Sequence, residues 1–256
     1  TPPPQVRTRW EGRQWHFLAV NLEQSVFYRI LFIGIIYLGG CGNGSFPSVE
    51  GKNDVDREHI GQTSTWNATS QSCKGLTATC GPSGNENCCK SLLVPGGTFS
   101  RSFDAVDYLD PSYTATVSDL YLDKYEVTVG RFRAFVNAGM GTQNDPPSES
   151  MGAHPKIKGS GWLSEWNDKL PASTTALKNF LKCYEDYQTW TDNPESNENK
   201  PINCLDWYTA FAFCAWDGGR LPTEAEWNYA ASGGSEHRYY PWSSPPASGA
   251  RPSSDW

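Results

Sequence analysis

The segment CAWDGGRLPTEAEWNYAASGG, from Cys214 to Gly234, carries the clearest structural signals in the sequence. Its pattern predicts the end of one helix, a tight turn at Gly218 and Gly219, and a second helix that follows Thr223. Glycine commonly follows the last turn of a helix because it adopts the left-handed backbone conformation without steric cost. The segment is therefore explained by architecture, and none of its residues requires a catalytic role.

The second of these helices begins with the pattern of a capping box. Between Thr223 and Glu226, the threonine hydroxyl and the glutamate carboxylate each satisfy a backbone N–H that has no helical partner. We expect Trp227, Ala230 and Ala231 to form the inward face of this helix, which should end at the glycine pair that follows.

Three other helices are predicted upstream of this segment. Thr128 is a suitable cap for a helix that ends at Gly139, with apolar residues at helical spacing between them. A second helix is expected from Ser173 to about Cys183. Asp206 is suited to cap a third helix, whose apolar residues are nearly continuous and predict that it is buried.

Strands are predicted before the first of these helices. The run SLLVPGGTFSRSFD predicts a strand with a turn at Pro95 to Gly97, and imperfect alternation predicts a second strand over Ala115 to Val127. Residues 140–172 are expected to form a loop.

Composition supports short elements and long loops. The 256 residues include 24 glycines and 18 prolines, and only 38% of residues are hydrophobic, although there are 11 tryptophans and 12 tyrosines. The formal net charge of −7 provides no basic surface, so a nucleic acid is not an expected partner.

Residues 1–40 are interpreted as upstream sequence followed by a signal segment. The nine apolar residues Ile30 to Leu38 are too few for a membrane span, which needs about 20, but suit the core of a signal peptide. Leu38-Gly39-Gly40-Cys41 resembles the lipobox of bacterial lipoproteins, which predicts lipidation of Cys41. The chain is then expected in the periplasm or cell envelope, anchored to a membrane. The alternative is a buried strand or core helix.

The polar residues 41–72 predict a flexible tether, and the next part, 73–92, is rich in cysteine. In an exported chain, cysteines are expected to form disulfides. Two connectivities are open for the first four cysteines, because the adjacent pair Cys88 and Cys89 cannot bridge each other without strain. These are 73–88 with 80–89, and 73–89 with 80–88; zinc is the weaker alternative. The expected disulfide cysteines are Cys73, Cys80, Cys88, Cys89, Cys183 and Cys204.

With Cys41 lipidated, this count leaves Cys214 unpaired, and its partner is expected outside these 256 residues. The four histidines are scattered without ligand spacing, so no metal ligand is predicted among them. Glu224 and Glu226 face different directions on a helix and do not form an acid–base pair. Arg220 is expected to form an internal salt bridge. No catalytic residue is predicted.

Four segments in order carry a resemblance to a known family: GGTFSRSF, LDKYEVTVGRFRAFVNAG, PINCLDWYTAFAFCAWDGGRLPTEAEWNYAASGG and YYPW. They resemble the sulfatase-modifying factor family, whose best-known members are formylglycine-generating enzymes. The match runs from about Leu93 to Trp242, so residues 93–256 are interpreted as the N-terminal part of such a domain. The resemblance implies a C-type-lectin-like variant of the α+β class, with little regular secondary structure and incomplete in this chain.

The same resemblance implies chemistry. Active members oxidise a cysteine in a Cys-x-Pro-x-Arg segment of a sulfatase to formylglycine, with oxygen and copper held by cysteines, and they also bind calcium. The copper-binding cysteine pair of the family lies in a segment that follows the motifs present here, and the calcium residues have no recognisable match. Cys214 corresponds to a cysteine that bridges to that later segment in many members. Copper and calcium are therefore implied for the complete domain, with no ligand assigned here.

Two functions are compatible with these observations. The first is oxidation of an exported sulfatase, with this chain alone expected to be inactive. The second is a non-catalytic, exported, lectin-like binding or scaffold module, for which another exported polypeptide would be the partner.

Overall fold

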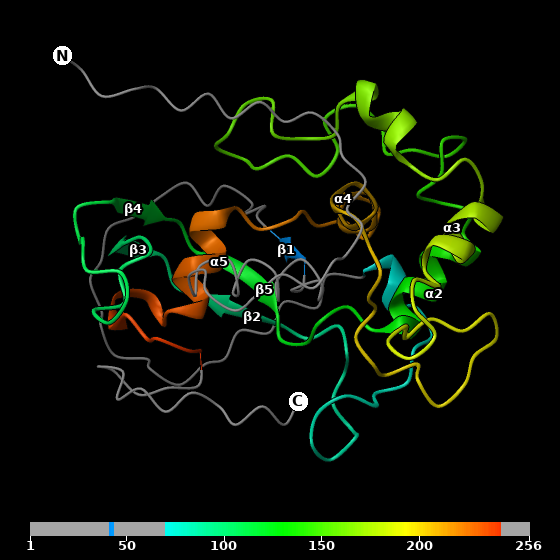
Figure 1. The fold of residues 1–256 in the computed structure, drawn as a ribbon, viewed down its shortest axis with the longest axis horizontal. Coiled ribbons are helices and arrows are strands. Elements are labelled where there is room, and N and C mark those ends of the chain that lie inside the picture. Colours follow the sequence, from blue (N-terminus) through cyan, green and yellow to red (C-terminus); the bar gives the residue numbers. More distant parts are fainter. Residues whose placement is uncertain (1–40, 44–69, 242–256) are drawn as a thin grey trace, which may run out of the picture.

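The computed structural model describes residues 41–43 and 70–241, which form a mixed arrangement of short strands and helices (Figure 1). The α+β class is thereby confirmed. Five strands form two antiparallel sheets: β1 (Gly42–Asn43), β5 (Leu120–Asp123) and β2 (Ser91–Val94) in that order, and β3 (Gly97–Ser100) with β4 (Thr114–Val117). The helices are α2 (Val129–Asn137), α3 (Thr174–Phe180), α4 (Trp207–Trp216) and α5 (Glu224–Ala231), with 3₁₀ turns at Gln71–Cys73, Ser164–Lys169 and Gly234–Glu236.

The strand predicted over Ala115 to Val127 is two strands, so that prediction is wrong in its length. The chain leaves the β3–β4 sheet at Val117 and joins β1 and β2 through β5, which starts at Leu120. The side chain of Asp119 accepts a hydrogen bond from the backbone N–H of Gly96 at 2.6 Å. A Cβ atom at Gly96 would lie 2.4 Å from the carbonyl oxygen of Val117, so only glycine allows the two turns to approach this closely.

The main hydrophobic core lies between α2, α3 and α4, in the half of the molecule away from β3 and β4 (Figure 1). Asp206 caps α4 by accepting a hydrogen bond from the backbone N–H of Thr209 at 2.7 Å, and α4 is buried on nearly all sides as predicted. The rings of Phe132 and Phe213 stack with centroids 5.3 Å apart. The large side chains that are buried completely in this core include Phe132, Phe135, Trp162, Leu177, Leu181, Ile202 and Phe213.

A smaller core joins α5 to the β3–β4 sheet, and it corrects the predicted face of that helix. Ala225 and Tyr229 pack against Phe99, Val117 and Leu120. The rings of Tyr229 and Phe99 meet edge to face at 5.1 Å. The predicted inward residues, Trp227, Ala230 and Ala231, are half-buried like Ala225 and Tyr229, but they are not among the residues packed against this core. The prediction followed their apolar character. The side of α5 that packs on the sheet instead carries Ala225 and Tyr229, which are four residues apart and therefore lie on one face of the helix.

The two remaining helix predictions, for α2 and α3, hold, except that α3 is shorter than expected. Thr128 caps α2 through its side-chain oxygen, as expected, and Ser173, where the second helix was expected to start, caps α3 in the same way. Helix α3 ends at Phe180 rather than near Cys183, and the chain then turns toward the disulfide of Cys183 with Cys204. The predicted loop over residues 140–172 contains the 3₁₀ helix Ser164–Lys169.

The predicted signal segment lies outside the described residues, as does most of the predicted tether. Both ends of the tether are placed: β1 follows Cys41 and pairs with β5, and Ser72 is buried. Among residues 41–43 and 70–241, no helix has the length and apolar character needed to span a membrane.

Candidate functional site

The cysteines are the first candidates for chemistry, and all eight lie in disulfides. In the cysteine-rich segment, the sequence left two connectivities open, and the structure has 73–89 with 80–88. Cys183 and Cys204 close the polar loop between α3 and α4, and Cys41 is bonded to Cys214. The four disulfides are Cys41–Cys214, Cys73–Cys89, Cys80–Cys88 and Cys183–Cys204.

The prediction that Cys214 is unpaired is wrong in this structure. Its partner, Cys41, precedes it by 173 residues, is 4% exposed, and enters the main core beside α4. A lipid on Cys41 would need the same sulfur atom, so lipidation and this disulfide exclude each other. The sequence signal is ambiguous because a cysteine after an apolar segment suits both a lipobox and a buried cross-link.

Copper is the cofactor that the family resemblance implies, and the described residues do not fit it. Copper(I) prefers soft sulfur ligands, and the thiolate form of cysteine is the one that binds metals. Each cysteine sulfur is instead bonded to another sulfur. In the described ranges, no group of three or more histidine, cysteine, aspartate or glutamate side chains is arranged to hold a metal ion. No reaction step through copper is therefore derived from these residues.

Arg131 is the centre of a buried polar network in the motif EVTVGRF. It is 1% exposed, and its two terminal nitrogens lie 2.7 Å from a carboxylate oxygen of Asp123 and 2.8 Å from one of Asp217. Its Nε donates to the hydroxyl of Ser72 at 3.0 Å. Burial alone would lower the pKa of Arg131, but the attraction of both carboxylates raises it. The network holds together α2, β5, the end of α4 and the first 3₁₀ turn. Its role is therefore structural.

Glu226 is the centre of a second buried network, within the segment that opens α5. Both oxygens of its carboxylate accept from Arg220, at 2.7 and 2.6 Å, and the backbone N–H of Thr223 donates to it at 2.8 Å. The predicted capping box and the predicted salt bridge of Arg220 are both present. Burial raises the pKa of Glu226, but the hydrogen bonds from Arg220 and Thr223 outweigh burial and lower it to about 2.

His154 completes this second network from the loop that precedes the Ser164–Lys169 turn. Its Nδ1 accepts from the backbone N–H of Lys156 at 3.1 Å, so the proton of the neutral ring lies on Nε2. That nitrogen donates to Glu226 at 3.2 Å. Glu226 is 4% exposed, so the histidine, the arginine and the carboxylate form a closed structural cluster without access to a substrate.

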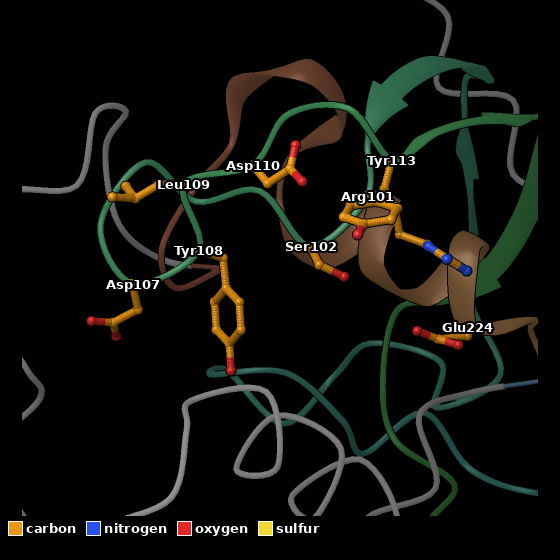
Figure 2. A pocket seen from close by; sticks show the side chains of 8 residues that line it. All are labelled: Arg101, Ser102, Asp107, Tyr108, Leu109, Asp110, Tyr113 and Glu224. Atoms are coloured by element: carbon orange, nitrogen blue, oxygen red, sulfur yellow. The ribbon is translucent and has the colours of Figure 1, made fainter. Parts of the chain in front are cut away.

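A surface pocket of 490 Å³ lies between the β3–β4 loop and the start of α5 (Figure 2). It was not predicted from the sequence. The loop RSFDAVDYLDPSY, residues 101–113, supplies most of its lining, and Glu224 supplies the helical side. The lining residues are Arg101, Ser102, Asp107, Tyr108, Leu109, Asp110, Tyr113 and Glu224.

Several hydrogen bonds hold this loop in one conformation. The carboxylate of Asp104 accepts from three successive backbone N–H groups, those of residues 106–108, at 2.8–2.9 Å. Ser102 has a positive φ of 66°, and its backbone N–H donates to the side chain of Asn228 on α5 at 2.9 Å. The loop is thus fastened both to itself and to the helix that forms the other wall.

The pocket carries both signs of charge. The guanidinium of Arg101 and the carboxylate of Glu224 have no ion-pair partner among the described residues. Asp107 accepts a hydrogen bond from the hydroxyl of Tyr239 at 2.6 Å, and burial together with Asp107 raises the pKa of that tyrosine. Hydrogen bonding to Ser112 lowers the pKa of Asp110. Asp107, Asp110 and Glu224 are exposed, so a ligand can reach their carboxylates.

One feature of the sequence indicates this site. Aspartate alternates with tyrosine and leucine in a long connection between two short strands, where a two-residue hairpin turn would suffice. The contribution of Glu224 could not be read from sequence, because it depends on how α5 packs on the sheet.

Comparison with known proteins gives a consistent set of relatives. Residues 77–256 match the model of the sulfatase-modifying factor enzyme 1-like domain. The chain is 31% identical over 163 residues to mouse formylglycine-generating enzyme, covering 60% of this chain and 42% of that protein. It is 34% identical over 172 residues to the chaperone protein LppX of Paenibacillus barcinonensis, covering 66% and 54%. It is 30% identical over 163 residues to mouse inactive C-alpha-formylglycine-generating enzyme 2, covering 58% and 49%.

The chain therefore spans about half the length of the curated relatives it matches. No solved structure matches it.

Proposed function

Because the chain belongs to the family of sulfatase-modifying factor enzyme 1-like domains, we propose that it is the polypeptide-recognition part of an exported domain. Its partner is another exported polypeptide, such as a sulfatase. The relatives named as formylglycine-generating enzymes and as a chaperone are consistent with a polypeptide as the substrate or client.

The observation that carries this proposal is the pocket beside α5. It is open at the surface, it is held in one conformation by the bonds of Asp104 and Ser102, and it combines charged with apolar side chains. Such a surface suits a polypeptide better than a small apolar ligand, which favours an enclosed and mostly apolar cavity. The buried networks of Arg131 and Glu226 support it as a rigid frame.

For the complete domain we propose oxidation of a sulfatase cysteine to formylglycine. Residues outside the described part would supply the copper ligands. The disulfides leave no thiolate in the described part for that purpose. In this proposal the described residues recognise the polypeptide and support the fold, and other residues of the complete domain carry out the oxidation.

The first test is turnover by the chain itself. We expect the 256-residue chain, incubated with copper and oxygen, to form no formylglycine in a Cys-x-Pro-x-Arg peptide, as measured by mass spectrometry of the peptide. Mouse formylglycine-generating enzyme serves as the positive control under the same conditions. Formylglycine produced by the chain would contradict the assignment of the chemistry to other residues.

A non-catalytic module is the second candidate function. Two relatives favour it, because one is named inactive and another is named a chaperone. The two candidates differ in a single respect: the oxidase needs two closely spaced cysteines in the remainder of the domain, and the binding module does not. Sequencing the reading frame beyond Trp256, followed by the same turnover measurement on the longer protein, separates them.

Export is part of the proposal for both candidates. Four disulfides are a typical feature of chains that fold in an oxidising compartment, such as the bacterial periplasm. Membrane anchoring through Cys41 is compatible only with a form of the chain in which the bond to Cys214 is not made.

A further inference from the structure

We propose that β1 is a removable strap over the edge of β5, closed by the disulfide between Cys41 and Cys214. The proposal concerns a conformational change of the fold and is independent of the proposed function. In the closed form, β1 lies beside β5, on the side toward α4 (Figure 1). Release of the disulfide opens this edge and leaves the rest of the sheet in place.

Non-covalent contacts hold β1 weakly. Among the residues that the structure describes, its two residues pair only with β5, Gly42 with Leu122 and Asn43 with Tyr121. Fixing the backbone of a residue costs conformational entropy that is similar in size to the net gain from one hydrogen bond. So short a strand therefore gains little from pairing, and the covalent bond at Cys41 decides whether it stays.

The disulfide of Cys41 differs from the other three in what it joins. Its two cysteines are 173 residues apart, whereas the others are separated by 16, 8 and 21 residues and close local loops. Cys41 is buried in the main core, and Cys214 on α4 is buried completely. This bond therefore ties β1 to a helix that is distant in the sequence, and the other three do not involve β1.

The position of β5 does not depend on β1. β5 pairs with β2 over four residues, and just beyond these the backbone N–H of Lys124 donates to the carbonyl of Lys90 at 2.7 Å. Leu120, at the start of β5, is buried in the smaller core, and Asp123, at its end, is paired with Arg131. We therefore expect β5 to stay in the sheet when β1 leaves.

The departure of β1 uncovers backbone groups of known position. In an antiparallel pair, successive residues direct their N–H and C=O groups to alternate sides of the strand. Because Lys124 donates toward β2, Leu122 also faces β2, whereas Tyr121 and Asp123 face β1. An uncovered strand edge is a template for pairing with another extended chain. The strap therefore decides whether this sheet is able to accept a further strand.

Closing the strap is an oxidation, and opening it is a reduction. For closure, the thiolate of Cys41 attacks the disulfide of an external thiol–disulfide oxidoreductase, and the thiolate of Cys214 then attacks the sulfur of Cys41 in the mixed disulfide. Two electrons and the two protons of the cysteine thiols pass to the oxidoreductase, which leaves as a dithiol. Opening is the reverse reaction and consumes a dithiol. Because both cysteines are buried in the closed form, a dithiol reaches them when β1 separates from β5.

Hydrogen exchange within one strand tests the strap. The variant Cys41→Ala removes the disulfide, and exchange of single backbone N–H groups is followed by NMR. We expect the N–H groups of Tyr121 and Asp123 to exchange at least about tenfold faster than in the unmodified chain, because β1 no longer covers them. The N–H of Leu122 should change by less than about threefold, since it faces β2.

The double variant Cys183→Ala, Cys204→Ala is the control, because it removes a disulfide that does not involve β1. It should leave the exchange of all three N–H groups unchanged. A second measurement needs no substitution. The unmodified chain is treated with dithiothreitol without denaturant, its disulfides are identified by iodoacetamide labelling and mass spectrometry, and the same N–H groups are followed. Loss of the disulfide of Cys41 should again accelerate the two N–H groups that face β1 and spare the one that faces β2.

Equal acceleration of the three N–H groups would overturn the proposal, because β5 would then unfold together with β1. A Cys41→Ala variant that fails to fold gives this result. Unchanged exchange at all three positions would also overturn it, since β1 would then stay in place without the disulfide. Acceleration of the same two groups in the control variant would show that the disulfide of Cys41 is not what holds the strap.

Discussion

Replacement of Arg131 by alanine is expected to lower the free energy of unfolding by about 3–5 kcal/mol, the cost of removing one partner from a buried ion pair. The change leaves Asp123 and Asp217 without a cation, and their side chains are only 6% and 2% exposed. Because a whole domain is stabilised by about 5–15 kcal/mol, this loss is a large fraction of the total stability.

The measurement is urea-induced unfolding followed by tryptophan fluorescence, with the disulfides intact. Arg131→Lys should recover only part of the loss, because a lysine cannot reproduce the forked contacts to both carboxylates and to Ser72. Arg238→Ala is the control. That arginine pairs with Glu236 near the surface, so its loss is expected to cost less than about 1 kcal/mol. Similar small losses for both alanine variants would show that the Arg131 network does not hold the elements together.

Replacement of Glu226 by glutamine is expected to produce the second large loss, about 3 kcal/mol at neutral pH. The neutral amide has the shape of the carboxylate, but it leaves Arg220 buried without its counter-ion and gives His154 a weaker acceptor. Glu224→Gln, two residues earlier on the same helix, is the control, because Glu224 is exposed and should change stability by less than about 0.5 kcal/mol.

The stability difference between the unmodified chain and Glu226→Gln is expected to depend on pH. The pKa of Glu226 is lowered from 4.5 to about 2 in the folded chain. A carboxyl with a lowered pKa stabilises the fold fully above its unfolded pKa, and this contribution is lost as pH falls toward the folded pKa. The free energy of unfolding of the unmodified chain should therefore decrease between about pH 5 and pH 2, and Glu226→Gln should lack that part of the decrease. Parallel profiles for the two proteins would contradict the role given to the ionised carboxylate.

Local signals in the sequence predicted the parts of the fold that are themselves local. The predicted caps at Thr128, Asp206 and Thr223 are all present, because each depends on a side chain and a backbone N–H three residues away. The internal salt bridge expected for Arg220 is also present, and its partner, Glu226, is only six residues distant.

Features that depend on distant packing were the ones that sequence reasoning missed. The inward face of α5 is chosen by the sheet that carries Phe99, which lies 130 residues before Tyr229. The partner of Cys214 is likewise distant, at Cys41, and no spacing rule connects them. The pocket needs both the β3–β4 loop and the start of α5 in place before its charges meet.

The central claim is that the described part of the chain is a disulfide-closed frame for recognition, with no thiol available for copper chemistry. Cysteine labelling tests this directly: the chain, produced with a periplasmic export signal, is denatured without reduction, treated with iodoacetamide, digested and analysed by mass spectrometry. We predict no alkylated cysteine and a cross-linked peptide joining Cys41 to Cys214. A lipid-modified Cys41 with an alkylated Cys214, or any two alkylated cysteines, would contradict the claim.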